Sequence, residues 1–369
     1  MKIQTTRSQL LDLIVFSSKA ISQKASAFIL SGVLLEADKE FNVYSTDLET
    51  SIKSTLEVKI LEKGKAVVPA KILINILKNL KESKIDLELN KETNQVHITS
   101  ENARFNLNTL SLEEYPTFPE IKSEESVKLE LDEFKDLITK VQRATSQDES
   151  RAILTGILME IKEGNLTLVA TDSYRLAKIK RKLEADNKEI KIVVPARVLD
   201  SINKSDFKKM DLEIILEENQ IIFLLKKEKK TRTVIISRLL SGKFPEYGQL
   251  IPEEMKHNIV IDREKVLEVV RRISSISQDN IPIKIIIGKG RMTAAMDIKE
   301  IGSSSEDFEA AYGGEDIEIS FNPFFLIDGL NMLEGKKIIF SIENPLKPIL
   351  IKPEKEKDIL YLLMPVRVS

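Results

Sequence analysis

The sequence predicts an α+β chain of three similar domains, each built from two helices and antiparallel β-sheet. Three observations support this fold class. The chain has 369 residues, too many for one small core, and its composition of 42% hydrophobic and 31% charged residues is that of a folded protein. Short motifs recur about 125 residues apart. Within each repeat, two amphipathic helical patterns alternate with short runs typical of strands.

Self-similarity defines the repeats. Three motifs recur: Val-Val-Pro-Ala at 67–70 and 193–196, Phe-Pro-Glu at 118–120 and 244–246, and Thr-Asp at 46–47 and 171–172, with Met-Asp at 296–297 as a third copy of the last. Their common spacing predicts three domains, at residues 1–125, 126–252 and 253–369. No long linker rich in Gly, Ser or Pro separates these segments, so we expect them to pack against one another.

Each repeat opens with a strand followed by a helix. The spacing i, i+3, i+4, i+7 marks this helix by apolar residues: Leu10, Leu13 and Ile14; Phe134, Leu137, Ile138 and Val141; Val266, Val269, Val270 and Ile273. The opening strands of the second and third repeats are predicted at Ser126–Leu131 and His257–Ile261. The proline of the Val-Pro-Ala motif can end a strand or begin a helix without breaking it.

A second helix therefore follows each Val-Pro-Ala motif, with Leu73, Ile76, Leu77 and Leu80 as its apolar face in the first repeat. In the third repeat the corresponding helix is predicted from Pro323 to Leu333. The remaining alternating or apolar runs, such as 166–170, 233–238 and 337–343, predict hairpins of antiparallel sheet.

The helices also carry basic residues on their exposed faces. The chain has 56 basic and 58 acidic residues, which excludes a uniformly basic nucleic-acid binder but permits a local basic patch. Basic residues recur at Lys71 and Lys78, at Lys140 and Arg143, and at Arg197. Any one of these is most simply a solvated helix face. If equivalent helices converge on one axis, they instead form a lining that attracts phosphate.

Motifs for catalysis are missing from the sequence. The chain has no cysteine and two histidines, His97 and His257, without a second histidine at ligand spacing from either. None of its four Gly-Lys pairs is followed by Ser or Thr, as a phosphate-binding loop requires, and no G-x-S-x-G motif exposes a nucleophile. The recurrence of Asp172 as Asp47 favours a turn-stabilising role for it. We therefore expect no enzymatic activity, no cofactor and no metal.

No apolar run is long enough to span a membrane, which predicts a cytoplasmic protein without membrane contact. Two segments stand out as functional. In residues 168–177 an apolar strand enters a turn that is predicted to expose Tyr174, Arg175 and Leu176 together. At the C-terminus, residues 360–369 are apolar almost to the end, where chains are usually polar. We interpret Tyr361–Leu363 as an edge strand and Met364–Val368 as an exposed apolar rim suited to binding peptides.

Taken together, these motifs resemble the bacterial DNA sliding clamps, the beta subunits of DNA polymerase III. The resemblance lies in Ala-Thr-Asp-Ser-Tyr-Arg-Leu-Ala at 170–177, Gly-Lys-Phe-Pro-Glu-Tyr at 242–247 and Leu-Met-Pro-Val-Arg at 363–367, and it extends over the whole chain. It implies a head-to-tail homodimer that closes a ring of six domains around duplex DNA, independent of base sequence. Its implied partners are the replicative DNA polymerase, the clamp loader and repair proteins, bound through short peptides containing Leu and Phe.

The resemblance also implies site residues. The peptide-binding cleft would comprise Arg151, Leu154, Thr171, Tyr174, Arg175, Leu176, Pro245, Leu250, Asn322, Phe325, Leu346, Pro348, Leu362, Leu363, Met364, Pro365, Val366 and Arg367. DNA-facing residues would be Lys24, Lys71 and Arg197, to which the basic helix faces add Lys78, Lys140 and Arg143. An apolar dimer seam would contain Phe105, Leu107 and Ile276, although each also suits an ordinary core.

Two alternatives remain open at this point. A repeat-built adaptor that binds peptides but not DNA would share the cleft. A carboxylate-dependent hydrolase would need a pair of acidic side chains that the sequence does not single out among its 58 acidic residues.

Overall fold

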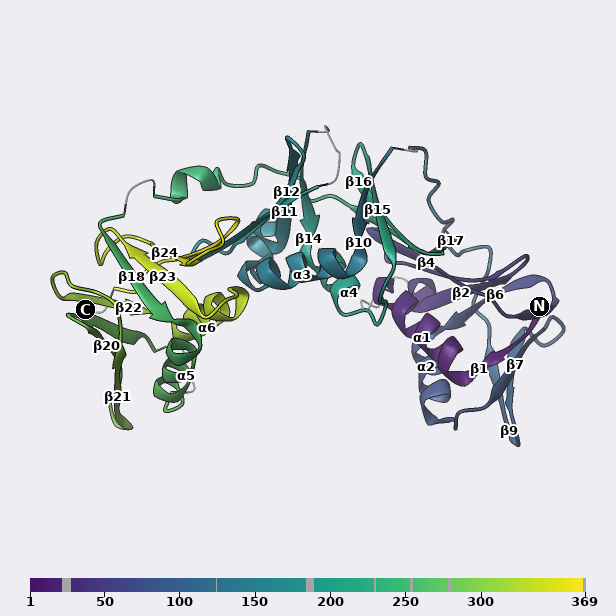
Figure 1. Ribbon diagram of the computed structural model, residues 1–369. Coiled ribbons are helices and arrows are strands. Elements are labelled where there is room, and N and C mark those ends of the chain that lie inside the picture. The colour runs from purple at the N-terminus through teal and green to yellow at the C-terminus, as the bar shows by residue number, and fades with distance from the viewer. Residues whose placement is uncertain are drawn as a thin grey trace. The chain divides into compact units, whose positions relative to one another are not determined.

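A computed structural model describes residues 1–21, 28–123, 125–183, 189–228, 230–252, 255–277 and 281–367 (Figure 1). The chain forms two compact units. The first contains Met1–Phe134 and Lys204–Leu239, and the second contains Lys135–Asn203 and Leu240–Ser369. Every strand pair in both units is antiparallel among the described residues. The predicted α+β class with antiparallel sheets is confirmed.

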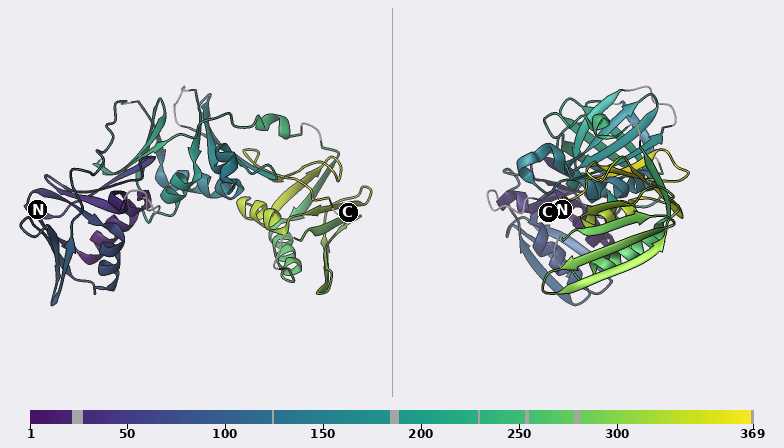
Figure 2. Two further views of the ribbon diagram at one scale, coloured as in Figure 1. Left: turned by 180° about the vertical axis from the view of Figure 1, so that it is seen from behind. Right: turned by 90° about the vertical axis from the view of Figure 1, so that its left-hand side faces the viewer.

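The first unit contains two sheets. The five-stranded sheet has the order β5 (Lys59–Glu62), β1 (Lys2–Thr6), β7 (Lys84–Asn90), β8 (Gln95–Ser100) and β9 (Ala103–Asn108). The eight-stranded sheet has the order β10 (Ser126–Glu130), β15 (Asp211–Glu217), β16 (Gln220–Lys227), β17 (Lys230–Arg238), β4 (Thr50–Leu56), β3 (Phe41–Thr46), β2 (Gly32–Ala37) and β6 (Gly64–Pro69). Helices α1 (Arg7–Ser17) and α2 (Ala70–Asn79) pack against each other and against these strands (Figures 1 and 2).

The second unit also contains two sheets. The eight-stranded sheet has the order β14 (Ile190–Pro195), β11 (Gly156–Lys162), β12 (Asn165–Thr171), β13 (Arg175–Lys182), β25 (Ile359–Leu363), β24 (Ile349–Pro353), β23 (Lys337–Ile342) and β18 (His257–Asp262). The four-stranded sheet has the order β21 (Gly302–Glu309), β20 (Arg291–Ile298), β19 (Ile283–Gly288) and β22 (Ile317–Phe321). Its helices are α4 (Ala196–Asn203), α5 (Arg263–Ser274), α6 (Pro323–Met332) and most of α3 (Leu131–Val141).

The helices begin where the sequence supplies a cap. The side chain of Asp262 accepts the backbone N–H of Lys265 at 3.1 Å and starts α5, and Asn322 accepts the N–H of Phe324 at 2.9 Å before α6. Pro323 then fills the first helical position, where its missing N–H costs nothing. The predicted apolar faces are buried: Phe134, Leu137, Ile138, Val141, Val266, Val269, Val270 and Ile273 are all in the core. Within the described residues each repeat contributes two α-helices, as predicted.

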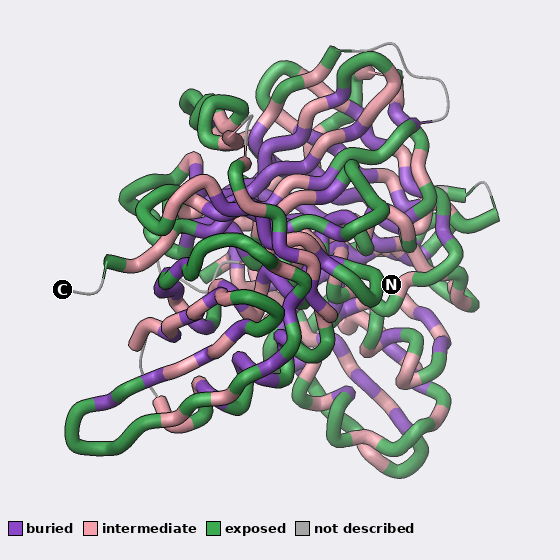
Figure 3. Tube along the Cα trace, turned by 60° about the vertical axis from the view of Figure 1, so that its left-hand side comes forward, coloured by how far each residue is buried: buried purple, intermediate pink, exposed green. Residues whose placement is uncertain are grey.

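The repeats share strand registers as well as motifs. Gly32 of β2 pairs with Pro69 of β6, and Gly156 of β11 pairs with Pro195 of β14. A Cβ atom on Gly32 would lie 2.8 Å from the Leu110 side chain, and one on Gly156 would lie 2.6 Å from Leu240. Both glycines are therefore required by the close approach of a returning segment. Figure 3 shows buried stretches along the strands and exposed ones in the turns.

The C-terminal strand departs from its prediction. Residues 361–363 were expected at the edge of a sheet, but β25 pairs with β24 on one side and with β13 on the other. Leu176 of β13 faces Leu362, and Leu362 also pairs with Leu350 of β24. The expectation is wrong because local alternation shows that a strand forms but not which strands flank it. One continuous sheet consequently joins the second and third repeats.

The compact units follow these sheets and not the period of the sequence. Each eight-stranded sheet combines strands of two neighbouring repeats, so residues 204–239 group with the first repeat. No helix in the described part of the chain is long and apolar enough to cross a membrane.

Candidate functional site

The turn between β12 and β13 presents Tyr174 to solvent. The Asp172 carboxylate accepts the backbone N–H groups of Tyr174 at 2.9 Å and Arg175 at 3.0 Å. Ser173 has a positive φ of 80°, which completes the tight turn. Tyr174 is thereby left 59% exposed. The hydrogen bonds from the backbone to Asp172 thus hold the turn in one shape, and this turn directs the Tyr174 ring outward.

The structural role predicted for the recurring aspartate is confirmed in two repeats. In the first repeat Asp47 accepts the N–H of Thr50 at 2.6 Å, as Asp172 does for Arg175. The third copy differs, because Asp297 lies inside strand β20 and forms no such turn. The Met-Asp resemblance at this position was too short to predict a turn.

Arg175 is buried beneath this turn, with its guanidinium bonded within the protein. Its Nε donates to Asp172 at 3.0 Å and its Nη1 donates to Asp328 at 2.6 Å. Its Nη2 donates to the backbone oxygen of Arg143, and the guanidinium lies 4.2 Å from the ring centroid of Phe325. All three nitrogens are occupied, so Arg175 links the turn to helix α6 and does not project toward a ligand.

The C-terminal segment runs beside the same turn. The Met364 N–H donates to the backbone oxygen of Tyr174 at 2.9 Å, and the Val366 N–H donates to that of Ser320 at 2.8 Å. The Tyr361 hydroxyl donates to the Phe325 backbone oxygen at 2.8 Å, and burial raises the pKa of Tyr361. These bonds hold Met364 next to Tyr174, where its side chain remains 38% exposed.

A buried apolar cluster underlies these exposed side chains. Its members are Leu154, Leu158, Val169, Leu176, Val193, Phe244, Leu350 and Leu362. Large apolar side chains emerge from the segments around it: Tyr174, Leu250, Leu346 and Met364 are 59%, 48%, 69% and 38% exposed. We call these four residues the tail surface. Exposed apolar groups over a firm apolar floor are typical of a surface that binds a partner.

The predicted cleft residues separate into exposed, half-buried and buried groups. Arg151, Tyr174, Pro245, Leu250, Leu346, Met364 and Arg367 are exposed, and Phe325, Asn322, Pro348, Pro365 and Val366 are half-buried. Leu154, Thr171, Arg175, Leu176, Leu362 and Leu363 are buried. The expectation that Arg175 and Leu176 are exposed together with Tyr174 is wrong, because Arg175 bonds to Asp328 of α6 and Leu176 is covered by the pairing of β13 with β25. Two polar members have internal roles: Thr171 donates to the Arg175 backbone oxygen at 2.7 Å, and Asn322 caps α6.

Sequence reasoning missed several members of this region. Phe244 belongs to the buried cluster and carried a signal, because it stands in the recurring Phe-Pro-Glu motif. Asp328 carried none, since a single acid on an otherwise apolar helix does not indicate the partner that it will meet. Leu158, Val169 and Val193 follow an ordinary strand alternation.

The predicted DNA-facing residues differ in their surroundings. Lys71 and Lys78 are exposed on α2, opposite the buried Leu73 and Leu77. Arg197 is exposed on α4. Lys24, which was also predicted to face DNA, lies outside the described residues. These placements leave the exposed face of α2 as the clearest basic surface.

Two other predicted DNA-facing residues, Lys140 and Arg143, are already paired with acidic side chains. The Lys140 ammonium lies 2.7 Å from Asp136 and 2.8 Å from Glu334, and its side chain is only 11% exposed. Arg143 lies 2.8 Å from Asp328 but keeps a side chain that is 60% exposed. A DNA phosphate would have to compete with these carboxylates at both positions.

The predicted dimer residues also divide. Phe105 lies on β9, the edge strand of its sheet, and is 36% exposed. Leu107, on the same face of that strand, is 7% exposed and belongs to the core of the first unit. Ile276 is half-buried just beyond the end of α5.

Family models and relatives agree on the identity of this chain. It matches the DNA polymerase III beta subunit in its N-terminal domain at residues 1–119, its central domain at 128–246 and its C-terminal domain at 248–367. The beta sliding clamp of Staphylococcus aureus is 30% identical over 364 residues, covering 95% of this chain and 94% of the relative. That of Staphylococcus epidermidis is 29% identical over 363 residues, with the same coverage.

Solved structures agree as well. The DNA polymerase sliding clamp of Bacillus subtilis superposes with a TM-score of 0.93 at 29% identity, covering 100% of both chains. A Bartonella birtlesii sliding clamp bound to griselimycin gives a TM-score of 0.92 at 28% identity, again with full coverage of both chains. These matches favour the sliding clamp over the adaptor and the hydrolase. The chain therefore belongs to the DNA polymerase III beta subunit family, the non-catalytic DNA sliding clamps of replication.

Proposed function

We propose that this sliding clamp recruits its partners through the tail surface, which binds short peptides carrying Leu and Phe. The observation that carries this proposal is the hydrogen bond from the Met364 N–H to the Tyr174 oxygen. It brings two exposed apolar side chains from distant segments together over one buried cluster. Met and Tyr adapt to several related side chains, which suits a surface shared by a polymerase, a clamp loader and repair proteins.

A fluorescence-polarisation titration tests this site. The probe is a labelled Gln-Leu-x-Leu-Phe peptide, added to the full chain and to a version that ends at Leu363. This truncation keeps strand β25 and removes Met364. We expect binding to the full chain and its loss on truncation. Equal binding to both versions would exclude the tail from the site, and binding to neither would reject the site.

The proposed DNA contacts are diffuse phosphate attractions from exposed basic residues. A ring that slides gains nothing from base-edge contacts, because each would hold it at one sequence by about 1–3 kcal/mol. Phosphate attraction is independent of sequence and allows translation along the duplex. Lys71, Lys78 and Arg197 suit this role by their exposure, while Lys140 and Arg143 are partly neutralised by their acidic partners.

We further propose a head-to-tail homodimer that closes the ring around DNA. Strand β9 of the first repeat and β21 of the third are edge strands of their sheets. The β9 strand carries Arg104 and the exposed Phe105, and β21 carries Glu306, Asp307 and Glu309. Glu306 is already paired with Arg272 within the chain, so the open backbone edges carry the argument for pairing of β9 with β21 of a second copy.

The proposal also includes domain boundaries near residues 125 and 252. It further includes a location in the cytoplasm, where the chromosome of a bacterium lies. The described residues 109–123 and 239–252 form irregular connections between the repeats, apart from a 3-10 turn at Tyr247–Leu250, and suit these boundaries.

A further inference from the structure

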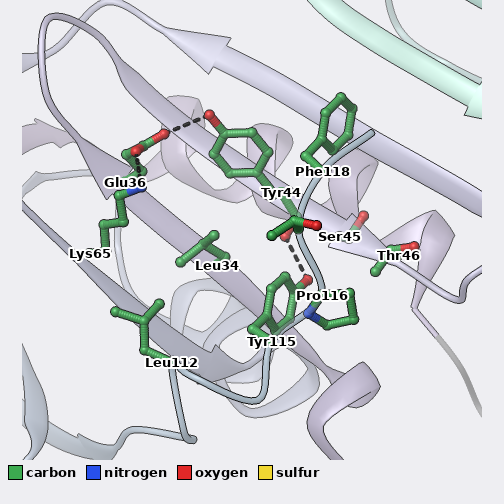
Figure 4. Close-up of a pocket in the computed structure, with 11 residues that line it drawn as sticks. Leu34, Glu36, Tyr44, Ser45, Thr46, Lys65, Leu112, Tyr115, Pro116 and Phe118 are labelled. Atoms are coloured by element: carbon green, nitrogen blue, oxygen red, sulfur yellow. Dashed lines mark hydrogen bonds and ion pairs between the residues drawn. The ribbon is translucent and has the colours of Figure 1, made fainter. Parts of the chain in front are cut away.

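The first repeat contains a pocket that the functions above do not use (Figure 4). Its volume is about 450 Å³, within the range of roughly 300–1,000 Å³ that ligand pockets occupy. Strands β2, β3 and β6 supply one wall, and the segment 112–118 supplies the other. All of the lining residues belong to the first compact unit.

Its position in the repeat matches that of the tail surface. Leu34 pairs with Tyr44 in the first repeat, and Leu158 pairs with Val169 in the second. The Leu110 N–H donates to the Val67 oxygen at 2.8 Å, and the Leu240 N–H donates to the Val193 oxygen at 3.0 Å. The pocket floor at Leu34 thus corresponds to Leu158, and Phe118 corresponds to Phe244 by its motif. Both counterparts lie in the cluster beneath the tail surface.

The pocket is held in shape by side chains that satisfy one another. The Tyr44 hydroxyl donates to Glu36 at 2.6 Å, and the Lys65 ammonium lies 2.6 Å from the same carboxylate. Burial, followed by the hydrogen bond to Glu36, raises the pKa of Tyr44. The Tyr44 and Phe118 rings meet edge to face with centroids 5.4 Å apart. Figure 4 shows these two rings and Leu34 facing the pocket, which therefore offers apolar surface beside the paired side chains of Glu36, Tyr44 and Lys65.

The opposite wall is where the two repeats differ. Seven residues separate Leu110 from Phe118, whereas three separate Leu240 from Phe244. The longer segment carries Leu112, which is 43% exposed, and Tyr115, whose hydroxyl donates to the Tyr44 backbone oxygen at 3.1 Å. Tyr115 anchors the segment and leaves Leu112 as an apolar wall beside the opening.

Charge then indicates the occupant. Glu113 and Glu114 lie between the lining residues Leu112 and Tyr115 and are both exposed, whereas the basic lining residue Lys65 is already paired with Glu36. Negative charge beside an apolar pocket favours a ligand with basic groups flanking an apolar anchor. We propose that this pocket is a second docking site, for an extended peptide segment that inserts a Leu or Phe side chain and carries Lys or Arg beside it. It is distinct from the tail surface, which lies in the other compact unit.

Two matched variants of the full chain test this proposal. The probe is a fluorescein-labelled Lys-Leu-Phe-Lys peptide, followed by fluorescence polarisation. Leu112→Arg replaces the apolar wall with a positive charge that repels the basic peptide. It should weaken binding about tenfold, which corresponds to about 1.4 kcal/mol. Leu346→Arg makes the same change on the tail surface, at a residue that is 69% exposed, and should leave the basic peptide bound as before. Glu113→Gln with Glu114→Gln should lower the salt dependence of binding.

The outcomes separate the two sites. Binding of the Gln-Leu-x-Leu-Phe probe should show the opposite pattern: Leu346→Arg should weaken it and Leu112→Arg should not. The proposal is overturned if Leu346→Arg releases the basic peptide, or if that peptide does not bind at all. A second measurement on the unmodified chain guards against misfolded variants: a benzophenone in place of the Phe should cross-link to residues 34–46 or 112–118. Cross-links confined to 154–176 or 346–364 would reject the pocket without affecting the tail surface.

Discussion

Asp328 of helix α6 bonds two arginines at once: one carboxylate oxygen lies 2.6 Å from Nη1 of Arg175, and the other lies 2.8 Å from Nη1 of Arg143. A residue of the third repeat thereby holds two residues of the second, one beneath the tail surface and one predicted to face DNA. Because Arg175 is only 9% exposed in its side chain, this pairing cannot be replaced easily by water.

Replacing Asp328 should therefore destabilise the second unit. Asp328→Asn leaves the buried guanidinium of Arg175 with Asp172 as its remaining carboxylate partner, at a cost of about 2 kcal/mol in the free energy of unfolding. Urea denaturation measures this loss. Asp136→Asn is the matched control, because that carboxylate pairs with Lys140 and is 53% exposed, so about 0.5 kcal/mol is expected. Equal losses in both variants would show that Arg175 does not depend on Asp328.

Met364→Ala should lower the affinity for the Gln-Leu-x-Leu-Phe peptide about tenfold and leave the dimer intact. The substitution removes an exposed apolar side chain and keeps the backbone bond to Tyr174, so folding is preserved. Fluorescence polarisation gives the affinity and size-exclusion chromatography gives the assembly. Ile301→Ala removes a comparable side chain, 69% exposed, outside the tail surface and should bind the peptide normally. Unfolding of Met364→Ala would instead assign the tail a structural role.

Lys71→Glu combined with Lys78→Glu should reduce DNA association and its dependence on salt. Both residues are exposed on α2, and each phosphate contact contributes about one unit to the slope of log affinity against log salt. A loss of about two units per subunit, or about four for the homodimeric ring, is expected in a titration of loaded circular DNA across salt concentrations. Lys39→Glu with Lys91→Glu makes the same charge change in turns of the first repeat. If the two double variants share one slope, α2 lies outside the DNA path.

Phe105→Glu and Ile276→Glu should each yield monomers. Phe105 is exposed on the edge strand β9, where an added carboxylate would be buried without a partner on dimerisation. Light scattering during size-exclusion chromatography measures the mass. Leu61→Glu is the matched control, because Leu61 is 43% exposed on β5, the opposite edge strand of the same sheet. Dimers of the two test variants would exclude this seam.

Stability should fall at alkaline pH because of the buried tyrosines. Burial raises the pKa of Tyr44, Tyr115, Tyr247 and Tyr361. A group whose pKa is raised on folding holds its proton more tightly in the folded state than in the unfolded state. Its contribution to stability is complete below the unfolded pKa of about 10 and is lost as the pH rises toward the folded value.

Urea denaturation between pH 8 and pH 11 should therefore show a decreasing free energy of unfolding above about pH 10, with phenolate absorbance appearing as the chain unfolds. Tyr361→Phe should lose stability at pH 8, since it gives up the bond to the Phe325 oxygen, but lose less on going to pH 11. A wild-type curve that stays flat to pH 11 would contradict this assignment.

The regular elements were predictable because their signals are local. The apolar spacing of Phe134 to Val141 follows the helical period, and the recurring Val-Pro-Ala motif marks a strand that leads into a helix in both repeats. Arg175 and Leu176 were predicted to be exposed in the same turn as Tyr174 and are buried by distant segments. Tyr174 is exposed as predicted, in a turn that Asp172 closes within three residues. Such features depend on neighbours in the chain and are therefore legible in one sequence.

The relations between distant segments were decided by the tertiary structure. Sequence alone established three related repeats of two helices each, a basic face on α2 and an apolar C-terminus. Packing decided that β25 lies between β13 and β24, that Arg175 is buried against Asp328, and that Lys140 is held by two carboxylates. Alternation and charge pattern assign a residue to a face, but which residues meet across that face depends on strand order and burial.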